Sequence, residues 1–234
     1  MAGYAHYRQA HPLVFVITHW INLVCMAMLV VSGMYIHYPF VDGFMGVVRG
    51  MHFVAMFTII VNLLFRIVAA FFVKTATQLG SREVETDIKN WLPQRENRHQ
   101  FFETLKYYLF LRKEGVISAK YGSLQKIAYL ATIPLTLAAA YTGFAIYGPT
   151  TGWGFLQAGT HAVGGAMNMR LVHYFIMWAF IVFTAIHAYL ANVYSFAPSR
   201  IIFAWKESPG HEHHAYDPDA IIAEKMNAGA KEIA

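Results

Sequence analysis

The chain has 234 residues, of which 57% are hydrophobic and only 13% are charged, and its formal net charge is +5 at pH 7. This composition is too apolar for an ordinary soluble domain, so a lipid bilayer is the first environment to consider. The single cysteine, Cys25, excludes disulfides and cysteine-based metal clusters within the chain, and any redox chemistry therefore needs other ligands.

Four apolar stretches are long enough to cross a bilayer, because a spanning helix needs about 20 mostly apolar residues. They cover residues 13–38, 51–73, 124–147 and 171–194. The first stretch is too long for the apolar part of a signal peptide and has no small-residue cleavage site, so we expect the protein to keep it. The sequence thus predicts an all-α fold: one membrane domain over residues 1–234, built as a four-helix bundle.

Positive charge is concentrated in the loop of residues 74–123 and in the tail of residues 195–234. The two remaining loops contain only Arg49 and Arg170 as basic residues. Because Lys and Arg are enriched in cytoplasmic loops, this asymmetry places the long loop, the tail and both termini in the cytoplasm. Membrane topology therefore explains the net positive charge without a nucleic-acid partner.

Within the long loop, residues 101–112 have an amphipathic pattern rich in aromatic side chains. This pattern predicts a helix along the cytoplasmic interface, and a connecting helix packed on the bundle is the alternative. The tail contains His211, Glu212, His213 and His214, which could bind a metal, but a solvated polar tail is favoured. We assign that cluster no function.

The first and second halves of the chain show a weak internal repeat. The segment that begins Ser32-Gly33 aligns with the one that begins Thr142-Gly143, including a shared Ile and Pro further on. The second and fourth stretches align with Arg, His and an aromatic residue in common. The repeat predicts two related helical hairpins in which His52 and His173 are equivalent.

Five histidines lie in the spans: His19, His37, His52, His173 and His187. Ionisable residues inside a membrane are costly and usually functional. His173 and His187 are 14 residues apart, which places them within about 40° on one helix face and roughly 21 Å apart along it. Such a spacing suits two haem groups, each of which needs axial ligands at its own depth in the bundle.

Each of these two ligands needs a partner at the same depth on another helix. With the amino terminus inside, His19 is level with His187, and His52 is level with His173, so the sequence predicts these two pairs. His37 competes for the outer site, but the repeat makes His52 the counterpart of His173. We therefore interpret His37 as an interfacial hydrogen-bonding residue.

Three arginines are candidates for contact with haem propionates. Arg66 is 14 residues after His52 and should reach the level of the inner haem, although its side chain could instead extend to the inner surface. Arg49 and Arg170 could meet propionates of the outer haem, and anchoring at the interface would also explain them.

With these residues the chain resembles the b-type cytochrome subunits of membrane-bound nickel-iron hydrogenases, in a wider group of di-haem cytochromes b that includes formate dehydrogenase gamma subunits. The resemblance is carried by the predicted haem-ligand histidines, of which one lies on the first span, one on the second, none on the third and two on the fourth. It includes the segments His19-Trp20, Arg49-Gly50-Met51-His52-Phe53 and Tyr107-Tyr108-Leu109-Phe110-Leu111.

The resemblance implies two haem b groups and a location in a bacterial or archaeal cytoplasmic membrane. It also implies an iron-sulfur small subunit and a catalytic large subunit on the periplasmic side, with hydrogen:quinone oxidoreductase as the activity of the complex. Electrons would enter at the haem of His52 and His173, cross to that of His19 and His187, and reduce menaquinone or ubiquinone near the cytoplasmic surface. Tyr121 and Gln125, with His187, are the candidates for contact with the quinone.

Two other functions are compatible with the same residues. A formate dehydrogenase or a sulfur-compound oxidoreductase could occupy the place of the hydrogenase, because the histidines do not distinguish these partners. A haem-free membrane protein that relays protons through intramembrane His and Arg residues is the alternative from a different class.

Overall fold

A computed structural model describes residues 11–76, 84–91, 100–112, 123–192 and 196–206 of the chain. The chain divides into two compact units. The first, which we call the helical unit, consists of residues 17–68 and 129–194, and the second of residues 1–16, 69–128 and 195–234.

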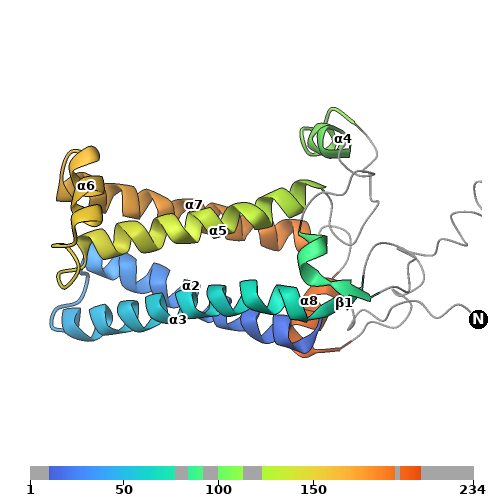
Figure 1. The fold of residues 1–234 in the computed structure, drawn as a ribbon, viewed down its shortest axis with the longest axis horizontal. Coiled ribbons are helices and arrows are strands. Elements are labelled where there is room, and N and C mark those ends of the chain that lie inside the picture. Colours follow the sequence, from blue (N-terminus) through green and yellow to red (C-terminus); the bar gives the residue numbers. More distant parts are fainter. Residues whose placement is uncertain (1–10, 77–83, 92–99, 113–122, 193–195, 207–234) are drawn as a thin grey trace, which may run out of the picture. The chain divides into compact units, whose positions relative to one another are not determined.

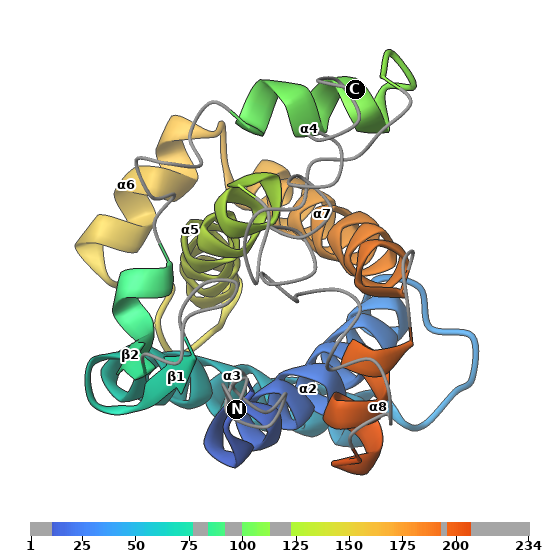
Figure 2. The ribbon, with the colours of Figure 1, turned by 90° about the vertical axis from the view of Figure 1, so that its right-hand side faces the viewer.

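The helical unit contains most of four long helices, α2 (Leu13–His37), α3 (Met45–Phe72), α5 (Ser123–Ile146) and α7 (Ala166–Asn192). All four are long and apolar enough to cross a membrane. In Figures 1 and 2, α2 lies beside α3 and α5 beside α7, so the unit consists of two helical hairpins. The predicted all-α membrane bundle is confirmed.

Helices α3 and α7 begin six and five residues earlier than the predicted spans, at Met45 instead of residue 51 and at Ala166 instead of residue 171. The added turns contain the exposed Arg49 and Arg170, which a search for apolar stretches leaves outside a span. A long basic side chain near a helix end can extend to the interface, so the helix continues past the apolar limit.

Proline residues follow the ends of α2 and α5, and two glycine residues precede α7. Helix α2 ends two residues before Pro39 and α5 three residues before Pro149, since a residue that precedes proline avoids the helical conformation. Gly164 and Gly165 have φ angles of 89° and 113°, which side chains other than glycine rarely adopt. They form the turn that leads into α7.

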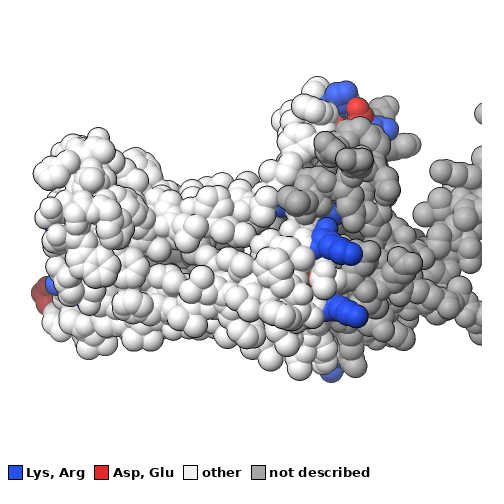
Figure 3. Space-filling model, viewed as in Figure 1, with Lys and Arg blue, Asp and Glu red and all other residues white. Residues whose placement is uncertain are grey.

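Each hairpin has a small buried cluster that includes an alanine, and many large apolar residues of the long helices are exposed. In α2 and α3 the buried cluster is Cys25, Ala55 and Ile59, and in the second hairpin it is Ala145, Leu156 and Met169. Small side chains let membrane helices approach closely, and exposed apolar side chains suit lipid. On the face shown in Figure 3, no charged side chain is visible along the middle of the long helices.

A short helix, α6 (Gly154–Ala162), joins α5 to α7 and was not predicted. Leu156 of α6 is buried, and the Tyr141 hydroxyl donates a hydrogen bond to the carbonyl of Phe155 at 2.8 Å. Tyr141 also fills the space beside Gly159, where a methyl group would lie 1.9 Å from its oxygen. Glycine at this position therefore lets α6 fold against α5.

The second unit contains the remaining elements: β1 (Lys74–Ala76), β2 (Val84–Thr86), η1 (Asp87–Asn90), α4 (Gln100–Tyr108) and α8 (Ala197–Ala204). The two strands pair antiparallel, with Thr75 opposite Glu85. Asp87 is buried and accepts hydrogen bonds from Thr75 Oγ1 at 3.3 Å and Trp91 Nε1 at 2.8 Å, which connect the strands to η1.

Helix α4 confirms that the aromatic segment of the long loop is helical, although the helix ends at Tyr108 and not at residue 112. Its position at a membrane interface stays a prediction. The strands, η1 and α8 were not predicted from the sequence. The histidine cluster at residues 211–214 lies outside the described residues.

Candidate functional site

Four histidines of the helical unit lie in two pairs, as the sequence predicted. The rings of His52 on α3 and His173 on α7 have centroids 6.4 Å apart, at an interplanar angle of 67°. The rings of His19 on α2 and His187 on α7 have centroids 6.3 Å apart, at 43°. Helix α7 therefore contributes one ring to each pair, and the two rings are 14 residues apart along it.

This separation of the rings suits one metal ion between them. A histidine nitrogen binds a metal at about 2.0–2.1 Å, and the ring centre lies about 1.2 Å further away, so two rings on opposite sides of one ion have centres roughly 6.4 Å apart. Rings in direct stacking contact lie closer, as His37 and Tyr174 do with centroids 4.3 Å apart. The geometry of both pairs thus fits axial ligation by two imidazoles.

Only two protein nitrogens are available in each pair. Within the ranges that the structure describes, no three His, Cys, Asp or Glu side chains gather closely enough to hold a metal ion by themselves. A six-coordinate metal held by two histidines needs four more ligands from a cofactor, and the four nitrogens of a porphyrin supply them. The residues therefore fit a haem at each pair better than a bare ion.

Hydroxyl groups from the neighbouring helices contact the first pair. Ser32 Oγ on α2 lies 2.9 Å from His52 Nδ1, and Thr142 Oγ1 on α5 lies 2.8 Å from His173 Nδ1. Both hydroxyl side chains are buried, with 2% and 5% of the residue surface exposed. Ser32 and Thr142 are equivalent in the sequence repeat, and they make equivalent contacts with equivalent histidines.

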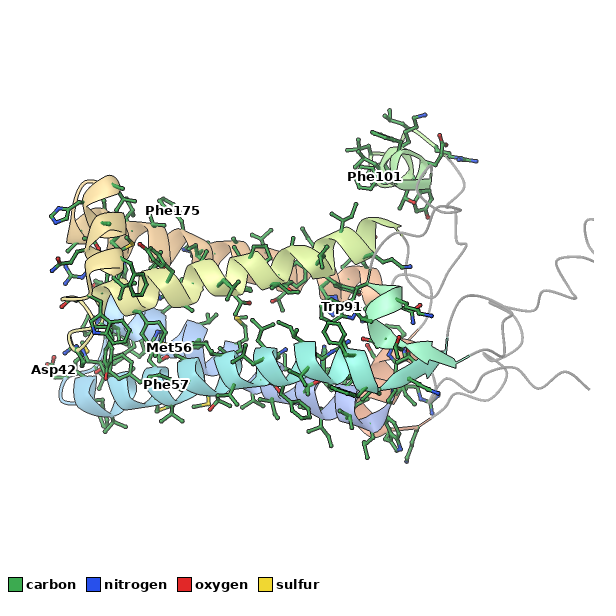
Figure 4. The ribbon with its side chains drawn as sticks, in the orientation of Figure 1. Asp42, Met56, Phe57, Trp91, Phe101 and Phe175 are labelled. Atoms are coloured by element: carbon green, nitrogen blue, oxygen red, sulfur yellow. The ribbon has the colours of Figure 1, made fainter. Side chains whose placement is uncertain are left out.

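The glycines that follow Ser32 and Thr142 also occupy equivalent positions beside the two histidines. A methyl group built on Gly33 would lie 3.5 Å from His52 Cε1, and one built on Gly143 would lie 3.3 Å from His173 Cε1. Each histidine ring thus lies against the glycine that follows the hydroxyl residue. Met56, one turn after His52, is buried and points between the helices in Figure 4. The neighbouring Phe57 ring lies toward α5, with its centroid 5.9 Å from that of Phe144.

Different neighbours surround the second pair. Phe183, one turn before His187 on α7, stacks on its ring with centroids 5.9 Å apart, and Tyr129 on α5 meets the same ring edge-on at 5.4 Å. His19 Nδ1 is buried and has no hydrogen-bond partner among the residues that the structure describes.

A buried amide connects α2 to α3 close to His19. Asn62 Nδ2 on α3 donates hydrogen bonds to the Thr18 carbonyl at 2.9 Å and to Asn22 Oδ1 at 2.7 Å. Thr18 directly precedes His19, so these bonds fix the separation of the two helices at that level. Polar side chains inside a membrane commonly serve this purpose.

The other predicted site residues are three arginines, a glutamine and a tyrosine. Arg66 lies on α3 with a buried Nη1 atom, and Arg49 and Arg170 are exposed. Gln125 lies in the first turn of α5, and Tyr121 lies outside the described residues. Their proposed contacts with propionates and quinone stay predictions.

The ring of His37 has a different partner from the rings of the first pair. Its ring is exposed and stacks on Tyr174, whereas His52 faces His173. The sequence repeat predicts that His52, and not His37, lies opposite His173, and the structure has His52 in that position.

Comparison with known proteins shows the family. Residues 10–204 match the family model described as prokaryotic cytochrome b561. The chain belongs to this family. Members of a cytochrome b family hold haem b, so family membership agrees with the fit of the histidine pairs to haem, and the protein is a multi-pass membrane cytochrome.

Relatives of this cytochrome b561 chain carry names that agree with the resemblance found in the sequence. It is 28% identical over 193 residues to the probable Ni/Fe-hydrogenase 1 B-type cytochrome subunit of Escherichia coli (strain K12), which covers 75% of this chain and 78% of the relative. It is also 28% identical to the probable Ni/Fe-hydrogenase B-type cytochrome subunit of Rhodobacter capsulatus, over 74% of this chain and 69% of the relative. The corresponding protein of Cupriavidus necator is 26% identical over 193 residues.

Sequence reasoning missed several residues that surround the histidines in this cytochrome. It aligned Ser32 with Thr142 without assigning them a hydrogen bond to an imidazole, and it did not single out Asn62 or Tyr129. An available signal was the position of each hydroxyl residue directly before a glycine in an apolar helix. That pattern places a polar atom and a close helix approach at the same level.

Proposed function

We propose that this cytochrome is the di-haem membrane subunit of a hydrogenase complex, which passes electrons from a periplasmic iron-sulfur/hydrogenase module across the membrane to a quinone. The observation that carries the proposal is the pairing of four histidines at ring separations of 6.4 Å and 6.3 Å. The names of the relatives support a nickel-iron hydrogenase as the partner. The proposed module consists of an iron-sulfur small subunit and a catalytic large subunit.

The paired histidines restrict what chemistry the site can support. His52 and His173 would hold one haem, and His19 and His187 would hold the other. A haem held by two imidazoles would supply one-electron exchange and not oxygen or substrate binding. Fourteen residues of α7 separate the two levels by roughly 21 Å, a large part of the bilayer core of about 30 Å.

The basic loop and tail support an orientation with both termini in the cytoplasm. The His52–His173 pair then lies near the periplasmic side, where the hydrogenase module docks. The His19–His187 pair lies near the cytoplasmic side, where menaquinone or ubiquinone accepts electrons beside Tyr121 and Gln125. We propose that Arg66 meets a propionate of the inner haem and that Arg49 and Arg170 meet propionates of the outer haem.

This orientation makes the electron transfer conserve energy. Moving one charge through 100 mV corresponds to about 2.3 kcal/mol. If the quinone takes its protons from the cytoplasm, each turnover separates charge across the membrane.

Histidine variants with optical spectra of the purified complex test the proposal. We expect a reduced-minus-oxidised spectrum with two b-type haems, one lost in both His52→Ala and His173→Ala and the other lost in both His19→Ala and His187→Ala. His161→Ala is the control, because His161 is exposed on the short helix α6. A single haem, or loss of the same haem in His19→Ala and His52→Ala, contradicts the pairing.

The same preparation distinguishes the other functions. A complex without a Soret band would favour the haem-free proton conductor. Nickel in a co-purified large subunit supports the hydrogenase, whereas molybdenum or tungsten without nickel would assign the haems to a formate or sulfur-compound oxidoreductase.

A further inference from the structure

We infer that Ser32 and Thr142 are positioning residues that fix the tautomer of His52 and His173 and lower the reduction potential of the haem that this pair holds. The inference rests on the proposed function, since it assumes a haem between these rings. It concerns the two hydroxyl contacts at 2.9 Å and 2.8 Å.

The direction of these hydrogen bonds follows from the second contact of each hydroxyl. Ser32 Oγ donates to the Met28 carbonyl, and Thr142 Oγ1 donates to the Ala138 carbonyl at 2.8 Å. A hydroxyl group has one proton, and two oxygen atoms without a proton between them would repel each other. Each hydroxyl therefore gives its proton to the backbone and accepts the Nδ1–H of the histidine.

This arrangement leaves the second ring nitrogen ready for iron. With the proton on Nδ1, the Nε2 lone pairs of His52 and His173 are available to the metal between the rings. A hydrogen bond accepted from Nδ1–H also orients the ring and makes it a more basic ligand. Because each hydroxyl oxygen is polarised by its own bond to a carbonyl, its capacity as an acceptor increases.

A more basic axial ligand favours the oxidised iron, so it lowers the reduction potential. The contacts given to His52 and His173 are absent at His19, whose buried Nδ1 has no hydrogen-bond partner in the described part of the chain. The hydroxyl pair thus shifts the potential of the first haem downward relative to the second. That shift favours electron flow from the His52–His173 level to the His19–His187 level, the direction of the proposed function.

Removal of one hydroxyl at constant shape tests the inference. Thr142→Val keeps the branched side chain and removes the acceptor, and Ser32→Ala removes the hydroxyl group beside the other ring. Thr136→Val is the matched control, because Thr136 lies on the same helix and its Oγ1 also donates to the carbonyl four residues earlier, at 2.8 Å. The measurement is a potentiometric titration of both haems in membranes that contain the whole complex.

We expect the midpoint potential of the haem that His173→Ala removes to rise in Thr142→Val and in Ser32→Ala, with the other haem unchanged. A threefold change in the equilibrium constant for each bond corresponds to a rise of about 28 mV, since a tenfold change is 59 mV for one electron. The double variant should shift by about twice as much. Thr142→Ser keeps a hydroxyl group at this position, so the haem should keep the original midpoint potential.

The outcomes separate this inference from the proposed function. Two b-type haems whose potentials do not move in Thr142→Val, or a shift of equal size in Thr136→Val, would overturn the inference alone. If Thr142→Val loses the haem, retention at the original potential in Thr142→Ser supports the role of the hydroxyl, and loss in Thr142→Ser overturns it. A complex without two b-type haems contradicts the proposed function itself.

Discussion

The two glycines beside the first histidine pair differ in how much space they leave, and the difference predicts different results for one substitution. An added methyl group would lie 3.3 Å from His173 Cε1 at Gly143 and 3.5 Å from His52 Cε1 at Gly33. Favourable carbon–carbon contacts lie at about 3.5–4.0 Å. Gly143→Ala therefore displaces the His173 ring by a few tenths of an ångström, whereas Gly33→Ala makes an ordinary contact.

The His173 ring cannot move without loss, because its Nδ1 lies 2.8 Å from Thr142 Oγ1 and its centroid lies 6.4 Å from that of His52. Overpacking of this kind costs about 1–3 kcal/mol. If the cost falls on the haem-bound state, it corresponds to about 5- to 140-fold weaker haem retention, since 1.4 kcal/mol is a factor of ten. Alanine also stabilises a helix by up to about 1 kcal/mol over glycine, but this gain is common to both variants and to both haem states.

The assay compares haem retention in the two variants. Purified complexes are mixed with an excess of a high-affinity haem scavenger, and the reduced-minus-oxidised spectrum is followed with time. We expect Gly143→Ala to lose the haem that His173→Ala lacks, and Gly33→Ala to retain both haems as the unmodified protein does. Equal retention in both variants, or loss of the other haem from Gly143→Ala, would refute the reasoning.

Three further predictions follow from other parts of the chain. Asn62→Leu removes two interhelical hydrogen bonds at about 0.6 kcal/mol each, and up to about 1.7 kcal/mol each, so thermal unfolding should occur at a lower temperature, whereas the exposed Thr58→Ala should leave it unchanged. His37→Ala should retain both haems in the optical spectrum, because its ring stacks on Tyr174; loss of either haem contradicts this. The hydrogen bond and charge of Lys106 lower the pKa of Glu103 on α4, so Lys106→Met should raise it in an NMR titration of the carboxyl group. Because the folded-state pKa is lowered, the Glu103 contribution to stability is present above the unfolded value of about 4.3 and is lost as the pH falls through the lowered one.

The sequence predicted the pairing of the histidines because helix geometry determines it. His173 and His187 are 14 residues apart, and a regular helix returns nearly to the same face over that distance. The repeat then selected His52 over His37 by alignment alone. A long apolar helix has to cross the bilayer from one side to the other. The depth of a residue in the membrane therefore follows from its position in the helix and from the side on which the helix begins.

The contacts that complete the site could not be predicted in the same way. Whether Ser32 donates to a ring or accepts from it depends on its bond to the Met28 carbonyl, which is a matter of side-chain rotation. The bonds of Asn62 depend on how α2 and α3 are turned toward each other. Helices α6 and α8 have nine and eight residues, which is too short for an apolar-length criterion to detect them.

The repeat that relates the two hairpins gives two different results at the two levels of histidines. His52 and His173 are equivalent to each other, so this pair is its own counterpart, and the contacts with Ser32-Gly33 and Thr142-Gly143 repeat across it.

At the level of His19 and His187, the same alignments make two other residues the equivalents of these histidines. The offset of 110 residues between Ser32 and Thr142 makes Tyr129 the equivalent of His19, and the offset of 121 residues between His52 and His173 makes Arg66 the equivalent of His187. Two histidine pairs at one level would require two macrocycles side by side within one four-helix bundle. Substitution of one pair by Tyr129 and Arg66 leaves a single ligand pair there, with Tyr129 against the edge of His187 and a cation on the opposite hairpin.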